Sequence, residues 1–167
     1  MNFKLERGSV VTVEPHARWD DEAILANARA LQSLGRAGES LRLLEGKHVA
    51  ILSNAGSSGN DDLFLSAARG LGAQVAEIRT ELWPTFPREE IHRIAALLDR
   101  LYAAVECQGM FRSIVQMIAT AASIPVYDHI ASPDHPTARI AMLLEGDATP
   151  DEKRRLVLQA VLLGTIA

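Results

Sequence analysis

Short apolar runs alternate with segments of helical periodicity along most of this chain, and this alternation limits the fold more than any other feature. The apolar runs are 47–52, 74–78, 103–107 and 124–128, and a loop and then a helical segment follow each one. Strands that are separated by helices are joined by right-handed crossovers, which place the strands parallel in one sheet. The sequence therefore predicts an α/β fold with three α/β/α layers around a four-stranded parallel sheet.

The helices are predicted from apolar residues that recur at helical spacing and from Gly or Pro stop signals. The expected helices are about 20–34, a segment ending at 71–72, and then 88–101, 110–122, 137–144 and 151–163. A length of 167 residues suits one domain, so we expect a single domain over 1–167 with its core at about 20–146. The helix at 151–163 turns from charged to apolar, and we expect it to cap an exposed face of the sheet.

Composition excludes several classes of function. The net charge of -4 provides no basic surface for nucleic acid. No apolar run approaches the roughly 18 residues that a membrane helix needs, and the charged first residues do not resemble a secretory signal, so we expect a cytoplasmic protein without membrane partners. With Cys107 as the only cysteine and no histidines at ligand spacing, we expect no disulfide, no metal and no cofactor.

Candidate functional residues lie in the loops after the strands, because ligands of open α/β sheets bind beyond the carboxyl ends of the strands. The loops are 53–60, 108–109 and 129–136. The first is rich in Gly and Ser and leads into a helix, which suits an anion cradle or simply a capped turn. It matches no nucleotide-binding motif and contains no Lys or Arg, and Asp61 and Asp62 in the first helical turn would repel an anion.

Three further features each have two interpretations. His135 precedes Pro136 at a helix start, where it would donate to a carbonyl, act as an acid or cap the helix. Cys107 ends a strand at the same edge, as a nucleophile or as a small buried hydrophobe. The aromatic loop 83–87 suits a mobile lid or a buried pair in a subunit contact.

Two ordered motifs carry a family resemblance. The first is Leu44-Glu45-Gly46-Lys47 before a strand, followed by a Gly/Ser loop and the run F-L-S-A-A-R-G-L-G at 64–72. The second is I-P-V-Y-D at 124–128, followed by H-P-T-A at 135–138. Over about 20–146 the chain resembles the amino-terminal, carbamoyl-phosphate-binding domain of the aspartate/ornithine carbamoyltransferases, and no second domain is expected after it.

The resemblance implies a ligand site in which the family's arginines are missing. The family's S-T-R-T-R loop falls on residues 57–61, a further arginine falls near Gln108, and a glutamine falls on Ala138. Each charge-assisted bond from arginine to phosphate contributes about 1.5–3 kcal/mol, so we expect carbamoyl phosphate to bind poorly. The resemblance implies that His135 polarises a carbonyl. The expected ligand-binding residues are Ser57, Ser58, Gly59, Asn60, Gln108 and His135.

Three functions follow as hypotheses. The first is a carbamoyltransferase-like pseudoenzyme that binds a small, less anionic ligand or a partner protein, as a homo-oligomer that the resemblance implies to be a trimer. The second is a component of a carbamoyltransferase of amino acid metabolism that a partner subunit completes. The third is a hydrolase that uses Cys107 and His135.

Overall fold

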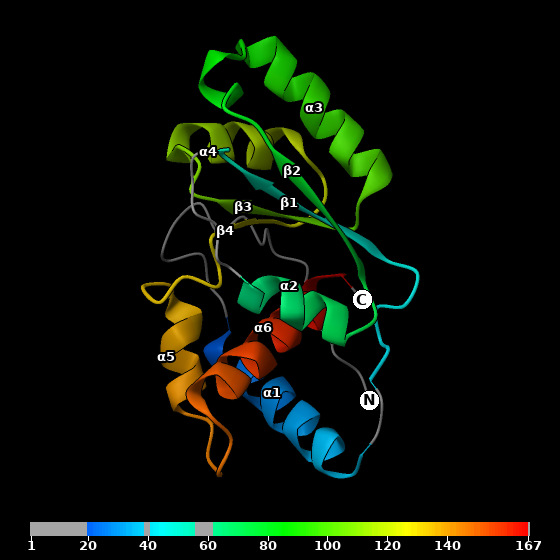
Figure 1. The fold of residues 1–167 in the computed structure, drawn as a ribbon, viewed down its shortest axis with the longest axis vertical. Helices are drawn as coiled ribbons and strands as arrows, with labels where there is room; N and C mark the ends of the chain where they lie inside the picture. The colour runs from blue at the N-terminus through cyan, green and yellow to red at the C-terminus, as the bar shows by residue number, and fades with distance from the viewer. Residues whose placement is uncertain (1–19, 39–40, 56–61, 167) are drawn as a thin grey trace.

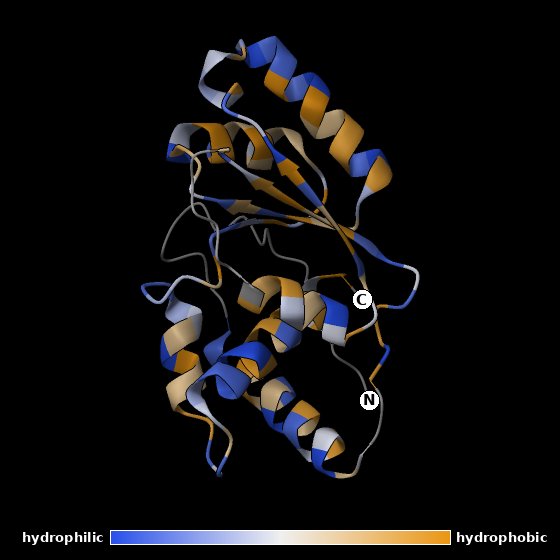
Figure 2. Cartoon of the chain, in the orientation of Figure 1, coloured by the Kyte–Doolittle hydropathy of each residue, from blue (hydrophilic) through white to orange (hydrophobic). Residues whose placement is uncertain are grey.

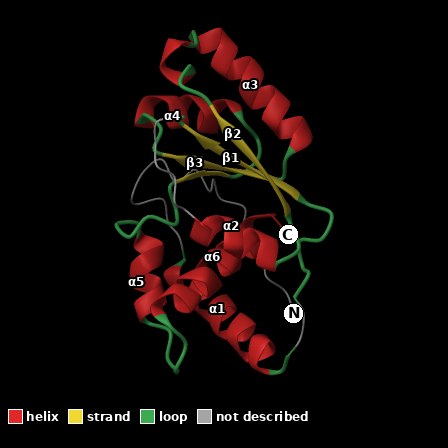
Figure 3. Ribbon diagram, viewed as in Figure 1, coloured by secondary structure: helices red, strands yellow, loops and turns green. Residues whose placement is uncertain are grey.

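The computed structural model describes residues 20–38, 41–55 and 62–166, and these form the alternating elements that the sequence predicts (Figure 1, Figure 3). The elements in chain order are α1 (Asp21–Arg36), β1 (His48–Ser53), α2 (Asp62–Gly70), β2 (Gln74–Arg79), the 3-10 helix η1 (Trp83–Thr85), α3 (Arg88–Leu101), β3 (Ala104–Gln108), α4 (Arg112–Ala121), β4 (Val126–Asp128), α5 (Pro136–Met142) and α6 (Pro150–Ile166). Each predicted strand and helix is present, with boundaries that differ by a few residues.

The four strands form one parallel sheet in the order β2-β1-β3-β4. Neighbouring residues on a strand point to opposite faces, so each central strand contributes to two cores. On β1, Ala50 and Leu52 belong to the core under α3 and α4, whereas Val49 and Ile51 belong to the core on the α2 side. The predicted α/β fold with helices on both faces of a parallel sheet is confirmed.

The two faces of the sheet are covered to different depths (Figure 1). One face carries the single layer of α3 and α4, and the opposite face carries α2, behind which α6 and α1 lie farther from the sheet. In Figure 2 much of β1 is coloured as hydrophobic, whereas α3 carries both hydrophilic and hydrophobic residues, as an outer helix does.

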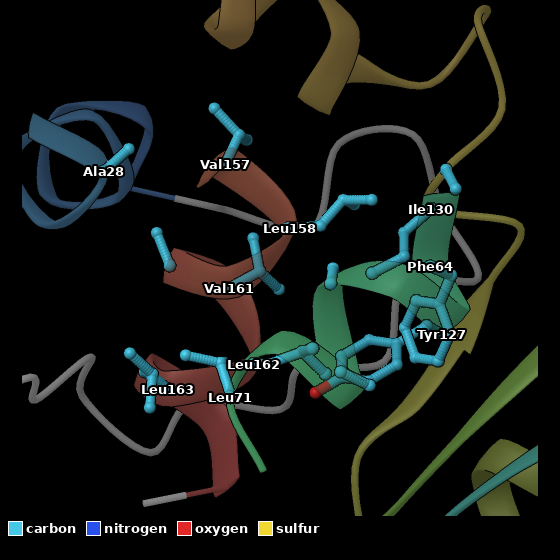
Figure 4. Packing of buried hydrophobic residues seen from close by; sticks show 14 of the residues in the cluster. Ala28, Phe64, Leu71, Tyr127, Ile130, Val157, Leu158, Val161, Leu162 and Leu163 are labelled. Atoms are coloured by element: carbon cyan, nitrogen blue, oxygen red, sulfur yellow. The ribbon is translucent and has the colours of Figure 1, made fainter. Parts of the chain in front are cut away.

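Helix α6 is the centre of the larger core. All residues from Val157 to Leu163 are buried, so this helix is enclosed on every side by α1, α2 and α5. Figure 4 shows its Leu158 and Leu162 beside Phe64 of α2 and Tyr127 of β4. The helix also meets the sheet directly, because Thr165 of α6 hydrogen-bonds to the Tyr127 hydroxyl of β4. The sequence predicted only a cap for the sheet, whereas in the structure α6 is in addition the hub of a helical layer. Within the described part of the chain, no helix is long and apolar enough to cross a membrane.

Candidate functional site

The loops that follow β1, β3 and β4 meet at the carboxyl edge of the sheet. The Asn54 side chain, just after β1, donates from Nδ2 to the backbone oxygen of Gly109, just after β3, at 2.9 Å. The backbone N–H of His129, just after β4, donates to the oxygen of Cys107 at 2.9 Å. The described parts of the three loops that the sequence selects are therefore held together at one edge.

Gln108 ends β3 at this edge, and its side chain is buried to 5 % exposure. Strand alternation places it on the same face as Ala104, whose side chain packs in the core on the α2 side. Among the residues that the structure describes, its Nε2 amide has no hydrogen-bond partner. A buried donor that lacks a partner costs about 1–3 kcal/mol, so this amide is a candidate donor to a ligand at the edge.

His135 is held in one tautomer by the start of α5. As the N-cap of that helix, its Nδ1 accepts a hydrogen bond from the backbone N–H of Thr137 at 3.2 Å. The Thr137 hydroxyl donates to the backbone oxygen of Ile130 at 2.6 Å, so its only proton is not available for the imidazole. Because Nδ1 is the acceptor, the ring proton lies on Nε2, and His135 can donate from that atom.

Burial keeps this imidazole neutral. Desolvation, together with the nearby charge of His129, lowers the pKa of His135 to about 4. An imidazolium acid is therefore absent near neutral pH. Of the roles that the sequence leaves open, the helix cap is observed, whereas the role as a donor to a carbonyl stays a prediction.

Two residues of this edge, Asp128 and Arg112, escaped the sequence-based selection, whereas His129 opens the selected loop 129–136. Burial raises the pKa of the Asp128 carboxyl, and the charges of Arg112 and His129 act in the opposite direction. His129 has a φ of 53°, a left-handed conformation that a non-glycine residue adopts at a cost and that is common at functional sites. The strand-end rule applied to β4 selected the loop from His129 onward and stopped one residue short of Asp128, whereas Arg112 is brought to them only by the fold.

Glu106 is the other unexpected residue. It is fully buried in β3, in register with Tyr127 of β4, and strand alternation places it on the same face as Gln108. Its charge contributes to raising the pKa of both Cys107 and Tyr127, after the larger effect of their burial. An acid inside an otherwise apolar strand, at 103–107, was the signal in the sequence.

The structure does not support a nucleophilic cysteine. Cys107 is fully buried in the core under α3 and α4, and its pKa is raised by burial and by the charges of Glu106 and Asp128. A thiol that resists ionisation is a poor nucleophile, so the Cys/His hydrolase hypothesis loses its chemical basis. Of its two interpretations, Cys107 as a small buried hydrophobe is the one that agrees with the structure.

The aromatic loop is part of the core. Trp83 is buried to 3 % exposure and donates from Nε1 to the backbone oxygen of Ser53 at 3.2 Å. Phe86 packs edge-on against it, with ring centroids 5.8 Å apart. Because Trp83 is buried within this chain, it is neither part of a mobile lid nor available for a subunit contact. Its hydrogen bond to Ser53 instead holds the end of β1 in place.

Part of the predicted site lies outside the described residues. This applies to Ser57, Ser58, Gly59 and Asn60, and to Asp61 beside them. Their role in ligand binding stays a prediction. Among the residues that are described, no three His, Cys, Asp or Glu side chains form a group that could hold a metal ion.

Sequence comparison finds ornithine carbamoyltransferases. The chain is 28% identical over 144 residues to the enzyme of Haemophilus influenzae (strain PittGG), which covers 86% of this chain and 43% of that protein. It is 26% identical over 141 residues to the enzyme of Cutibacterium acnes, covering 84% of this chain and 42% of that protein. The chain thus spans less than half the length of the curated relatives that it matches. No model of a known protein family matches it.

Solved structures share the fold. Aspartate transcarbamoylase from Trypanosoma cruzi in complex with phosphate has a TM-score of 0.63 and 24% identity, covering 83% of this chain and 44% of that one. Ornithine carbamoyltransferase from Burkholderia thailandensis has a TM-score of 0.61 and 19% identity, covering 74% and 43%. The resemblance first seen in two sequence motifs is confirmed: this chain is similar in sequence to ornithine carbamoyltransferases over 86% of its own length, and it shares its fold with solved ornithine and aspartate carbamoyltransferases.

Proposed function

We propose that the carboxyl edge of the sheet binds a small ligand through hydrogen bonds to an uncharged acceptor, and that the chain by itself does not transfer a carbamoyl group. The observation that carries this proposal is the Gln108 amide, which is buried without a partner among the described residues. A ligand carbonyl or ether oxygen would satisfy it. His135, with its proton on Nε2, supplies a second neutral donor from the neighbouring loop.

The charges at this edge support an uncharged acceptor over a phosphate dianion. By the family resemblance, Gln108 lies near the position at which an arginine contacts phosphate, so a neutral amide is found where a formal positive charge is expected. Glu106 and Asp128 add carboxyl groups near the same strand ends. Of the described cations at this edge, Arg112 interacts with Asp128 and Arg154 donates to the backbone oxygen of Ala131. Carboxylates near the site repel a dianion, and each lost arginine removes about 1.5–3 kcal/mol of attraction.

Calorimetric titration with carbamoyl phosphate, inorganic phosphate and the neutral probe acetamide tests the proposal. We expect no saturable binding of the two anions below about 1 mM, which corresponds to a binding free energy near -4 kcal/mol. Acetamide should bind weakly, with shifts of the Gln108 side-chain N–H signals in nuclear magnetic resonance. Micromolar binding of carbamoyl phosphate to the wild-type chain would reject the proposal.

A gain-of-charge variant makes the test sharper. Gln108→Arg restores a cation at the end of β3, and we expect it to strengthen phosphate binding by about tenfold, equivalent to about 1.4 kcal/mol. Gln116→Arg adds the same charge at an exposed position of α4 and serves as the matched control. Equal phosphate binding by both variants would show that the effect is not local to the edge.

The competing function is a carbamoyltransferase component that further protein completes. It is favoured by the match to ornithine carbamoyltransferases over 43% of their length. In that case carbamoyl phosphate should bind tightly once the completing partner is present, and citrulline formation from ornithine should appear. The homo-oligomer, a trimer by family resemblance, also stays a prediction, and sedimentation velocity measures it.

A further inference from the structure

Among the residues that the structure describes, strand β2 forms one outer edge of the sheet, and no described strand lies beside its outward-facing backbone groups. The inward groups are fixed by the pairing with β1, because Gln74 donates to Lys47 and Thr80 donates to Ser53. Backbone direction alternates along a strand, so the N–H and C=O groups of Val75, Glu77 and Arg79 point away from the sheet. An open edge of this kind is a template for another strand.

Charge and apolar side chains on this edge follow a symmetric pattern. Glu77 and Arg79 lie on the same face and form an ion pair at 2.6 Å, with side-chain exposures of 36% and 54%. Ile78, between them, points to the opposite face and is 36% exposed although it is large and apolar. The order acidic, apolar, basic is complementary to itself when it is read in the opposite direction.

We propose that β2 pairs antiparallel with β2 of a second copy of this chain, about a two-fold axis that passes beside Ile78. In this register Glu77 of each copy faces Arg79 of the other, and these two residues exchange backbone hydrogen bonds, as their outward groups require. The two Ile78 side chains face each other as a closely spaced pair on the other face. The two sheets then form one continuous sheet.

The hydrogen-bond pattern and the charges select this register over its neighbours. Only residues whose backbone groups point outward can exchange hydrogen bonds, so a shift moves the pairing in steps of two residues, which keep outward-pointing residues opposite outward-pointing residues. One such shift places Glu77 against Glu77, and the shift in the other direction places Arg79 against Arg79. Like charges directly opposite each other are destabilising. The charges of Glu77 and Arg79 thus disfavour pairing of β2 with unrelated strands and favour its pairing with β2 of a second copy in this one register.

Sedimentation equilibrium of the full chain, with charge-reversal variants, tests the proposal. We expect Glu77→Arg to weaken self-association by roughly tenfold, because two opposite-charge pairs become like-charge pairs. Arg79→Glu should do the same, and the double variant Glu77→Arg/Arg79→Glu should restore association to near the wild-type level. A wild-type chain that stays monomeric up to about 1 mM, or association that is insensitive to both single reversals, would overturn the proposal.

A control and a second readout separate this contact from general effects of charge. Glu90→Arg reverses one member of an exposed ion pair with Arg93 on α3 and should leave association unchanged. Amide hydrogen exchange reports the contact directly. The N–H groups of Val75, Glu77 and Arg79 should become protected as protein concentration rises, whereas those of Ala76 and Ile78 are protected at all concentrations. Outward amides that exchange rapidly at every concentration would also contradict the pairing.

Discussion

Acid should destabilise this protein through His135, because the folded state holds that imidazole neutral. Burial lowers its pKa from the usual 6.5 to about 4, so between these values the unfolded chain binds a proton that the folded chain does not. Stability that is fully present above pH 6.5 is therefore lost progressively as the pH falls toward 4. Below that pH both states are protonated, and the contribution of His135 no longer changes.

The magnitude follows from the size of the shift. One pKa unit corresponds to about 1.4 kcal/mol, so a fully buried imidazole with this shift would account for about 3 kcal/mol. His135 is only partly buried and water screens its charge, so we expect a loss of about 1–2 kcal/mol between pH 7 and pH 4.5. This is a substantial fraction of the stability of an ordinary domain.

Urea unfolding at a series of pH values, for the wild type and for His135→Asn, measures this contribution. Asparagine keeps an acceptor at the N-cap of α5 but does not titrate, so the variant should lack about 1–2 kcal/mol of the pH dependence. His92→Asn, at an exposed position of α3, should behave as the wild type does. Parallel stability curves for the wild type and His135→Asn would refute the lowered pKa of His135.

Three further predictions concern stability and reactivity. Tyr127→Phe should lower the free energy of unfolding by about 1 kcal/mol, because the buried hydroxyl hydrogen-bonds to Thr165; Tyr102→Phe is the control, and urea unfolding measures both. Asp99→Ala should cost about 1–3 kcal/mol, because this carboxylate accepts from the backbone N–H of Ser123 at 2.8 Å; a loss below about 0.5 kcal/mol would contradict this contact. Cys107 should react with a thiol reagent at neutral pH only after unfolding, since burial raises its pKa; rapid reaction of the native chain would revive the nucleophile.

The sequence determined the order and type of the secondary-structure elements. Local periodicity reports the spacing of apolar residues, and that spacing is what separates a strand from a helix. For this reason the predicted helix 88–101 has the bounds of α3, and each predicted strand overlaps an observed one. The strand-end rule likewise placed Gln108 and His135 at one edge of the sheet, because both follow or end strands of the same parallel array.

Only the tertiary structure decided which residues meet and how each is charged. The apolar pattern of 151–163 is equally consistent with a cap and with a buried hub, and the choice depends on contacts with α1, α2 and α5, far away in the chain. Likewise, the neutral state of His135 depends on burial and on His129, and the inert state of Cys107 depends on burial beside Glu106. Desolvation and neighbouring charge act through space, so no reading of local sequence supplies them.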